Sequence, residues 1–209
     1  MKWGVPPHFF WLGDESRPTR FSTILQKAAR TGWAGRTLAR TRLSLLGNLL
    51  THYRYRLAKV SVTERPGELE INVSGGCGGA SSFLNQTGET WESSPDLQFI
   101  GRERVRVTTI DRAASQYYST GDRLFLKIDV QGYERKVLEG ASDTMPRIVG
   151  LRMELSISQF YEGEPPMQEM LDYVYGLGFR LCAIDEAWSD PRTREVFQMD
   201  GVFFRVSAL

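Results

Sequence analysis

The chain has 209 residues, of which 41% are hydrophobic and 24% are charged. That length suits a single domain with one core, and the composition is typical of globular proteins, so disordered and fibrous classes are excluded. No run of about 18 apolar residues and no signal-peptide pattern occurs, so we expect no transmembrane segment and a cytoplasmic location. The cysteines and histidines match no metal spacing, so we expect neither a disulfide nor a metal: Cys77, Cys182, His8 and His52.

The formal net charge of +1 hides a sharp asymmetry along the chain. Residues 1–60 hold 11 Lys and Arg against two acidic residues, whereas residues 61–209 hold 15 against 23. A basic arm can bind nucleic acid or an anionic membrane, and it can equally be a solvated face. The arginine-rich stretch 28–42 also has the composition of GC-rich DNA translated in a wrong frame, a hypothesis that translation of the other frames tests.

Two helices are predicted within this basic part. Apolar side chains recur at three- and four-residue steps within residues 18–30, which predicts a short amphipathic helix. Leucines between residues 38 and 50 predict a second helix, which Gly47 weakens. Such helices usually pack on the body of a protein with their arginines solvated, although they can also contact a membrane or a partner. We therefore divide the chain into a basic, helix-prone segment, residues 1–56, and a main domain, residues 57–209.

From residue 57 the pattern changes to the alternation of apolar and polar residues that is typical of strands. One strand is predicted before a turn at residues 65–67, and a second is predicted over residues 69–73. The glycine-rich run 75–79 predicts a flexible loop. This run lacks the strand-to-helix context of a dinucleotide-binding fingerprint, so it indicates no cofactor on its own.

The buried-strand pattern at residues 124–130 is the most informative element. An extended segment that ends at Asp111 and a helix over residues 112–118 precede it, and a helix over residues 133–140 follows it. A carboxylate, Asp129, therefore lies near the carboxyl end of a strand.

The rest of the chain continues the alternation of strands and helices. A helix that Gly178 closes is predicted over residues 167–177, and extended segments are predicted over residues 148–155, 180–184, 196–198 and 201–204. Strands that alternate with helices predict the α/β class, with a mostly parallel sheet. The last two neighbouring strands predict an antiparallel carboxyl-terminal edge.

Short motifs follow one another in a fixed order through residues 57–206. The strongest is Leu126-Lys-Ile-Asp-Val-Gln-Gly132, followed by Glu134 and Val137-Leu-Glu-Gly-Ala141. The others are Glu68–Val73, Ala80–Phe83, Val105–Asp111, Arg152–Leu155, Tyr161–Gly163, Gly178–Phe179 and Gln198–Phe203. Each motif alone would be common by chance, but in this order they resemble the FkbM family of S-adenosylmethionine-dependent O-methyltransferases.

The resemblance implies a Rossmann-like methyltransferase fold, S-adenosylmethionine as the methyl donor, and a hydroxyl acceptor on a sugar or a secondary metabolite. The implied partner is a small molecule or glycan, no nucleic acid is expected, and the oligomeric state stays open. In the family the first strand ends in a glycine-rich turn, and no such turn is found before residue 57, where Asp14 and Glu15 are the nearest acidic candidates. We therefore expect a sheet that is incomplete at its amino-terminal part.

Three residues are the catalytic candidates. Asp129 is predicted to orient the acceptor hydroxyl or take its proton, and the alternative is a cap on the following helix. Glu154, on the next strand, is predicted to bind the acceptor or act as a second base, unless it pairs with Lys127 or Arg152. Lys127 lies two positions from Asp129 and so on the same strand face, where it would lower the pKa of Asp129, bind the acceptor, or form a structural ion pair.

Five residues are predicted to contact the cofactor: Ser81, Ser82, Asp111, Asp129 and Gly132. The roles of the two serines and of Asp111 come mainly from the resemblance, since such residues also serve as turn and cap residues. Gly132 is predicted to serve the backbone geometry next to Asp129. Tyr161 and Asp200 either line the acceptor side or stabilise loops.

The predicted reaction places few chemical demands on the protein. Methyl transfer from a sulfonium centre is an in-line displacement, so the protein mainly aligns the acceptor oxygen with the methyl carbon and excludes water. The resemblance therefore implies an O-methyltransferase, and nothing in the sequence requires a metal. Two alternatives stay open: a truncated or frame-disrupted relative without activity, and a binding module that docks through its basic segment.

Overall fold

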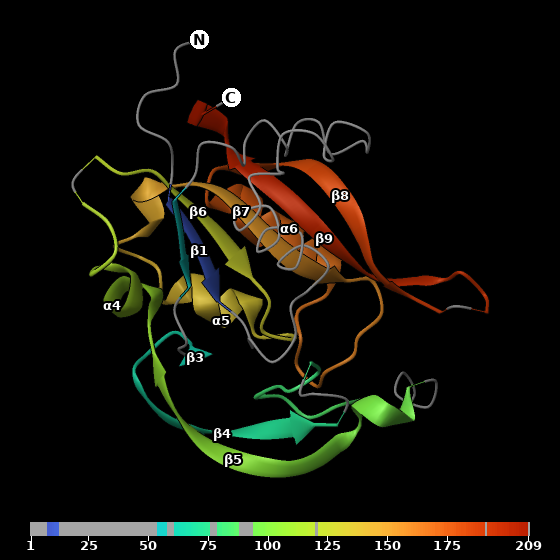
Figure 1. Cartoon of the computed structure of the whole chain (residues 1–209). Helices are drawn as coiled ribbons and strands as arrows, with labels where there is room; N and C mark the ends of the chain where they lie inside the picture. Colours follow the sequence, from blue (N-terminus) through green and yellow to red (C-terminus); the bar gives the residue numbers. More distant parts are fainter. Residues whose placement is uncertain are drawn as a thin grey trace, which may run out of the picture.

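The computed structural model describes residues 8–12, 54–57, 61–75, 79–87, 94–119, 121–190 and 192–208. Its strands form two sheets, one of six strands in the order β2-β1-β6-β7-β9-β8 and one of three in the order β3-β5-β4 (Figure 1). The strands are β1 (His8–Leu12), β2 (Arg54–Leu57), β3 (Ser61–Val62), β4 (Gly67–Ser74), β5 (Phe99–Thr108), β6 (Leu124–Ile128), β7 (Ile148–Ser156), β8 (Phe179–Ser189) and β9 (Val196–Arg205). The helices are α4 (Ile110–Ala114), α5 (Glu134–Glu139) and α6 (Met167–Gly176), with 3-10 turns at Pro95–Leu97, Met145–Arg147 and Val206–Ala208.

The six-stranded sheet combines parallel and antiparallel pairing. Strands β2, β1, β6 and β7 pair in parallel, whereas β9 pairs antiparallel with both β7 and β8. Within the described residues, the longest strand pairings are all antiparallel: β4 with β5, β7 with β9 and β8 with β9. The predicted α/β class is confirmed, but parallel pairing does not dominate the molecule as a whole.

Strands β1 and β2 lie on the side of β6 where we expected the sheet to be incomplete. Residues 8–11 of β1 pair in register with β2, and all of β1 pairs with β6. The expectation of missing amino-terminal strands therefore does not hold for these two positions. The helices predicted over residues 18–30 and 38–50 lie outside the described residues, as do residues 76–78 of the glycine-rich loop.

The three-stranded sheet is built around β5. The strands predicted on either side of the turn at residues 65–67 are β3 and β4, and each pairs with β5 instead of with the other. The Thr63 N–H, which follows β3, donates to the Thr108 carbonyl at 2.8 Å and so holds the start of the turn against the end of β5. Figure 1 shows β4 and β5 as long, curved strands below the six-stranded sheet.

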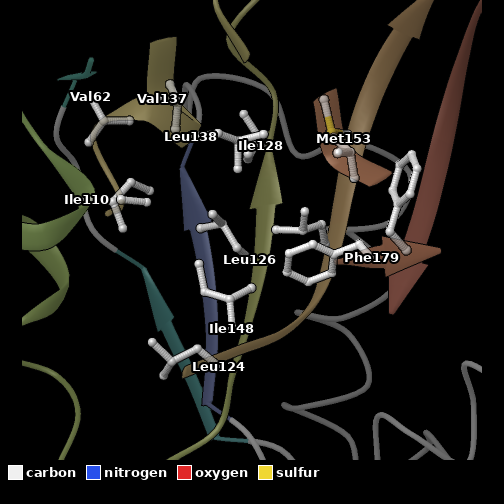
Figure 2. Close-up of a cluster of buried hydrophobic side chains, with 14 of the residues drawn as sticks. Val62, Ile110, Leu124, Leu126, Ile128, Val137, Leu138, Ile148, Met153 and Phe179 are labelled. Atoms are coloured by element: carbon white, nitrogen blue, oxygen red, sulfur yellow. The ribbon is translucent and has the colours of Figure 1, made fainter. Parts of the chain in front are cut away.

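The main core lies on one face of the six-stranded sheet. Side chains alternate along a strand, so Leu124, Leu126 and Ile128 of β6 share this face, and they pack with residues of β7 and α5 (Figure 2). Lys127 lies on the opposite face and is also buried. Among the helices that the structure describes, none is long and apolar enough to span a membrane.

Helix α6 covers this core beside β7 and β8 and ends as the sequence predicts. It buries Met170 and Val174. Gly178 follows it with a φ of +86°, a left-handed conformation that glycine adopts at little cost. The chain then enters β8, so the glycine sets the direction in which the antiparallel edge begins.

Candidate active site at the end of strand β6

The order of the strands reverses between β1 and β6. Strand β2 lies on the far side of β1, whereas β7 lies on the far side of β6. In open α/β sheets, ligands bind outside the carboxyl ends of the strands at such a reversal. The last residue of β1, Leu12, pairs with the last residue of β6, Ile128, and Asp129 comes next. Asp129 therefore lies where the topology favours a ligand.

Charged residues form two rows across the strands on the sheet face opposite the core. Lys127, two positions before Asp129, lies opposite Arg152 of β7 in the strand register. In the next row on this face, Glu154 lies opposite Asp200 of β9 in the strand register. The Arg152 Nη2 atom lies 2.7 Å from Asp200 Oδ2 and 3.4 Å from Asp185 Oδ2 of β8. Although carboxylates gather here, the described residues contain no cluster of His, Cys, Asp or Glu that could hold a metal.

Lys127 and Asp129 form a close ion pair. The Lys127 Nζ donates to Asp129 Oδ2 at 2.6 Å, and the exposed fractions of the two side chains are 5% and 24%. Burial alone would raise the pKa of Asp129, but the charge and hydrogen bond of Lys127 outweigh it and hold this pKa below its usual value. Asp129 is therefore an ionised carboxylate that keeps some contact with solvent.

Glu154 has the opposite tendency. Burial raises its pKa well above the usual value, and the negative charges of Asp129, Glu134 and Asp200 raise it further, while Lys127 partly opposes them. The pair therefore favours one ionised carboxylate, Asp129, and one protonated carboxyl, Glu154. Two carboxyl groups whose surroundings push their pKa values apart are typical of sites that handle protons.

Gln131 links these two carboxyl groups, and the sequence analysis did not name it as a site residue. Its Nε2 donates to Asp129 Oδ1 at 3.2 Å and to Glu154 Oε2 at 3.0 Å. Its Oε1 lies 2.9 Å from the Tyr161 hydroxyl, and its backbone carbonyl accepts from Ser82 Oγ at 2.7 Å. The sequence signal that could have identified Gln131 is its place in the strongest motif, directly after the end of β6.

Gly132 allows the chain to turn tightly after Gln131. Its φ is +88°, and a Cβ atom there would lie 3.2 Å from side-chain atoms of both Leu84 and Tyr161. Both observations favour glycine, since other residues would be strained and crowded at this position. The predicted backbone role of Gly132 agrees with this geometry.

Of the other predicted cofactor contacts, only Ser82 joins the cluster around Asp129. The Ser81 hydroxyl accepts from the Ser74 N–H at 3.0 Å. The Asp111 carboxylate accepts from the N–H groups of Asp143 and Thr144 at 3.0 and 2.8 Å, so it caps the turn after α5. These bonds match the turn and cap alternatives, and contact of the three residues with a cofactor stays a prediction.

Glu134 is a further acidic residue that the sequence analysis did not select. It starts α5, its side chain is buried, and its Oε1 accepts from the Val130 N–H at 3.3 Å. Burial raises its pKa to about 8, and the charges of Glu164 and Asp129 contribute to the rise. The folded protein therefore holds a proton on Glu134 that the unfolded chain releases near pH 4.5.

A pH-dependent stability follows from Glu134. Because its pKa is raised by folding, the contribution of the protonated form is complete below about pH 4.5 and is lost as the pH rises through about 8. In the wild type the free energy of unfolding should therefore fall by an amount on the order of 3 to 5 kcal/mol between these limits. Glu134→Gln, whose side chain cannot ionise, should not show this fall. Urea unfolding of both proteins at several pH values measures this, and equal slopes with pH would contradict the assignment.

Comparison with known proteins agrees with the earlier resemblance. One curated relative, a 2-O-methyltransferase NoeI of Sinorhizobium fredii (strain NBRC 101917 / NGR234), is 27% identical over 124 residues, which are 57% of this chain and 51% of that protein. The chain thus spans about half the length of the curated relative that it matches. No solved structure matches significantly. The methyltransferase FkbM domain matches residues 19–181, well over half of the chain, and this protein therefore belongs to the FkbM methyltransferase family.

Proposed function

We propose that this protein is an S-adenosylmethionine-dependent O-methyltransferase that methylates a hydroxyl of a sugar or a secondary metabolite. The observation that carries the proposal is the position of Asp129, a partly exposed carboxylate at the carboxyl end of β6 where the strand order reverses. Family membership supports the methyl transfer, and the name of the matched relative, a 2-O-methyltransferase, supports an oxygen acceptor.

The arrangement of the strands supports a Rossmann-like interpretation of the larger sheet. Four strands, β2, β1, β6 and β7, pair in parallel, and β9 then adds antiparallel at the carboxyl-terminal edge. The ends of β1 and β6 are adjacent, and an ionised carboxylate follows β6. Ligands of open α/β sheets bind at such a reversal of strand order, which supports placing the proposed cofactor beside Asp129.

Asp129 has the properties that the acceptor side of the reaction needs. S-adenosylmethionine, when bound, supplies an electrophilic methyl group on a positively charged sulfur. Asp129 would accept a hydrogen bond from the acceptor hydroxyl and fix the direction of its oxygen lone pair. As the new carbon–oxygen bond forms, the hydroxyl proton becomes strongly acidic, so even a carboxylate with a lowered pKa accepts it.

A transfer assay tests the proposal. The purified chain is incubated with methyl-labelled S-adenosylmethionine and a set of sugars and secondary metabolites that carry free hydroxyls. We expect the label to appear as a methyl ether on an oxygen of one acceptor class. Donor binding, measured by isothermal titration calorimetry, separates this function from the inactive-relative alternative, because an inactive relative that lacks the donor site would release no heat of binding.

A further inference from the structure

The two carboxyl groups at the ends of β6 and β7 are joined through one amide group. Glu154 follows Met153, which pairs with Ile128, so Glu154 is level with Asp129 on the neighbouring strand. Gln131 Nε2 donates to an oxygen of each of them. Both N–H bonds of this amide are thereby used, which leaves little freedom in the relative orientation of the two groups.

The Gln131 amide is itself held from two sides. Its backbone has a φ of +54°, which is uncommon for a residue with a side chain and persists only where surrounding contacts fix it. Ser82 Oγ provides such a contact through its hydrogen bond to the Gln131 carbonyl. The Tyr161 hydroxyl has one proton and lies within reach of Gln131 Oε1 and of the Ala80 carbonyl. Donation to Oε1 turns the NH₂ group towards the carboxyls.

The residue that orients Gln131 is anchored in turn. Tyr161 is fully buried, and the loop that carries it is held by Glu164, which accepts from the backbone N–H groups of Phe160 and Tyr161 at 3.0 and 3.2 Å. Ser156, the last residue of β7, donates to Glu164. The series of contacts therefore runs from Ser156 of β7 through Tyr161 to Gln131, and the bond from Gln131 to Glu154 returns it to the same strand.

We propose that Gln131 is a positioning residue, which fixes the separation and direction of the Asp129 and Glu154 carboxyls so that one acceptor hydroxyl meets both in a defined geometry. The contact with an acceptor hydroxyl rests on the proposed function, whereas the hold of Gln131 on the two carboxyls does not. Gln131 acts through these groups and has no direct chemical step of its own.

Gln131→Met in the full chain tests the hold on the carboxyls, because methionine keeps the bulk and removes both donors. Titration of carboxyl ¹³C resonances in the ligand-free protein should show the pKa of Asp129 raised by about one unit, since an N–H donor favours the ionised form. The other charged groups near the pair, Lys127, Arg152, Glu134 and Asp200, are unchanged in this variant. An unshifted Asp129 titration would overturn the proposal.

Gln86→Met is the matched control. Gln86 is also half-buried and also bridges two groups, donating to the Leu97 carbonyl at 2.9 Å and accepting from the Phe99 N–H at 3.3 Å. Its backbone pairs with Tyr161, but the substitution changes only the side chain, which makes no hydrogen bond to Asp129 or Glu154 among those of the described residues, so both titrations should stay unchanged. An equal shift in both variants would show a general effect of lost packing and would also overturn the proposal.

Kinetics tests the functional part. Gln131→Met should lower kcat by about 10- to 100-fold, because the acceptor is misaligned, and should leave the donor Kd within about twofold of the wild type. The acid limb of the pH profile of kcat should move to higher pH. Tyr161→Phe, which removes only the hydroxyl, should act in the same direction and replaces Gln131→Met if that variant does not fold. A wild-type chain that binds no donor would refute the proposed function, yet the ¹³C titration would still decide the role of Gln131.

Discussion

Asp129→Asn should lower kcat for methyl transfer by about 100- to 10,000-fold, the usual range for loss of a proton-accepting group. Asparagine keeps the shape of the side chain and can hold the acceptor loosely, but it cannot take the hydroxyl proton. Donor affinity should change far less than kcat, because Asp129 is proposed to act on the acceptor. Steady-state kinetics with labelled S-adenosylmethionine and a donor titration of the same protein provide the two measurements.

Glu70→Gln is the control for this substitution. Glu70 lies in the three-stranded sheet, is exposed, and pairs with Arg102 at 3.3 Å, so the variant loses an ion-paired carboxylate away from β6. It should keep wild-type turnover. Undiminished turnover by Asp129→Asn would remove Asp129 from the reaction, and a circular dichroism spectrum shows whether any loss reflects unfolding.

Lys127→Met should destabilise the protein by about 3 kcal/mol at pH 8, because it leaves the half-buried Asp129 carboxylate without its cation. In the wild type the pKa of Asp129 is lowered, so the ion pair stabilises the fold above the unfolded value of 3.8 and is lost as the pH falls through the folded value. Without Lys127, burial dominates and the pKa of Asp129 rises. The difference in the free energy of unfolding between the wild type and Lys127→Met should therefore shrink towards acid pH.

Lys136→Met tests whether this effect is specific. Lys136 also pairs with a carboxylate, Glu139 at 3.0 Å, but 44% of its side chain is exposed. Exposed pairs contribute about 0 to 1 kcal/mol, so this variant should unfold close to the wild type at every pH. Urea unfolding at pH 8 and pH 5 compares the three proteins. If the stability lost in Lys127→Met is the same at both pH values, the assigned ion pair is contradicted.

The part of the site on β6 could be predicted from the sequence because it depends on local pattern. Residues 124–128 form a short apolar run interrupted only by Lys127, and such runs are typical of buried strands. The two-residue period then places Lys127 and Asp129 on one face, and the structure shows them in contact. The strand end, the carboxylate and its cation were therefore all visible in seven consecutive residues.

The contacts of Gln131 could not be predicted in the same way. They depend on Ser82 and Tyr161, which are 49 and 30 residues away in the chain, and on a left-handed backbone conformation that the sequence does not reveal. Strand β1 was missed for another reason. His8–Leu12 is rich in aromatic residues that favour strands, but a single five-residue run gives no periodicity and does not show that it pairs with β6.

The most direct test of the whole account is a titration of the ¹⁵N-labelled chain with S-adenosylmethionine, followed by nuclear magnetic resonance. We predict saturable shifts of the Gln131 side-chain amide and of the backbone amides of Val130 and Gly132, which flank it at the end of β6. Amides of residues 102–106 in β5 should stay unchanged. No shift at the end of β6, or shifts confined to the three-stranded sheet, would contradict a methyltransferase site at Asp129.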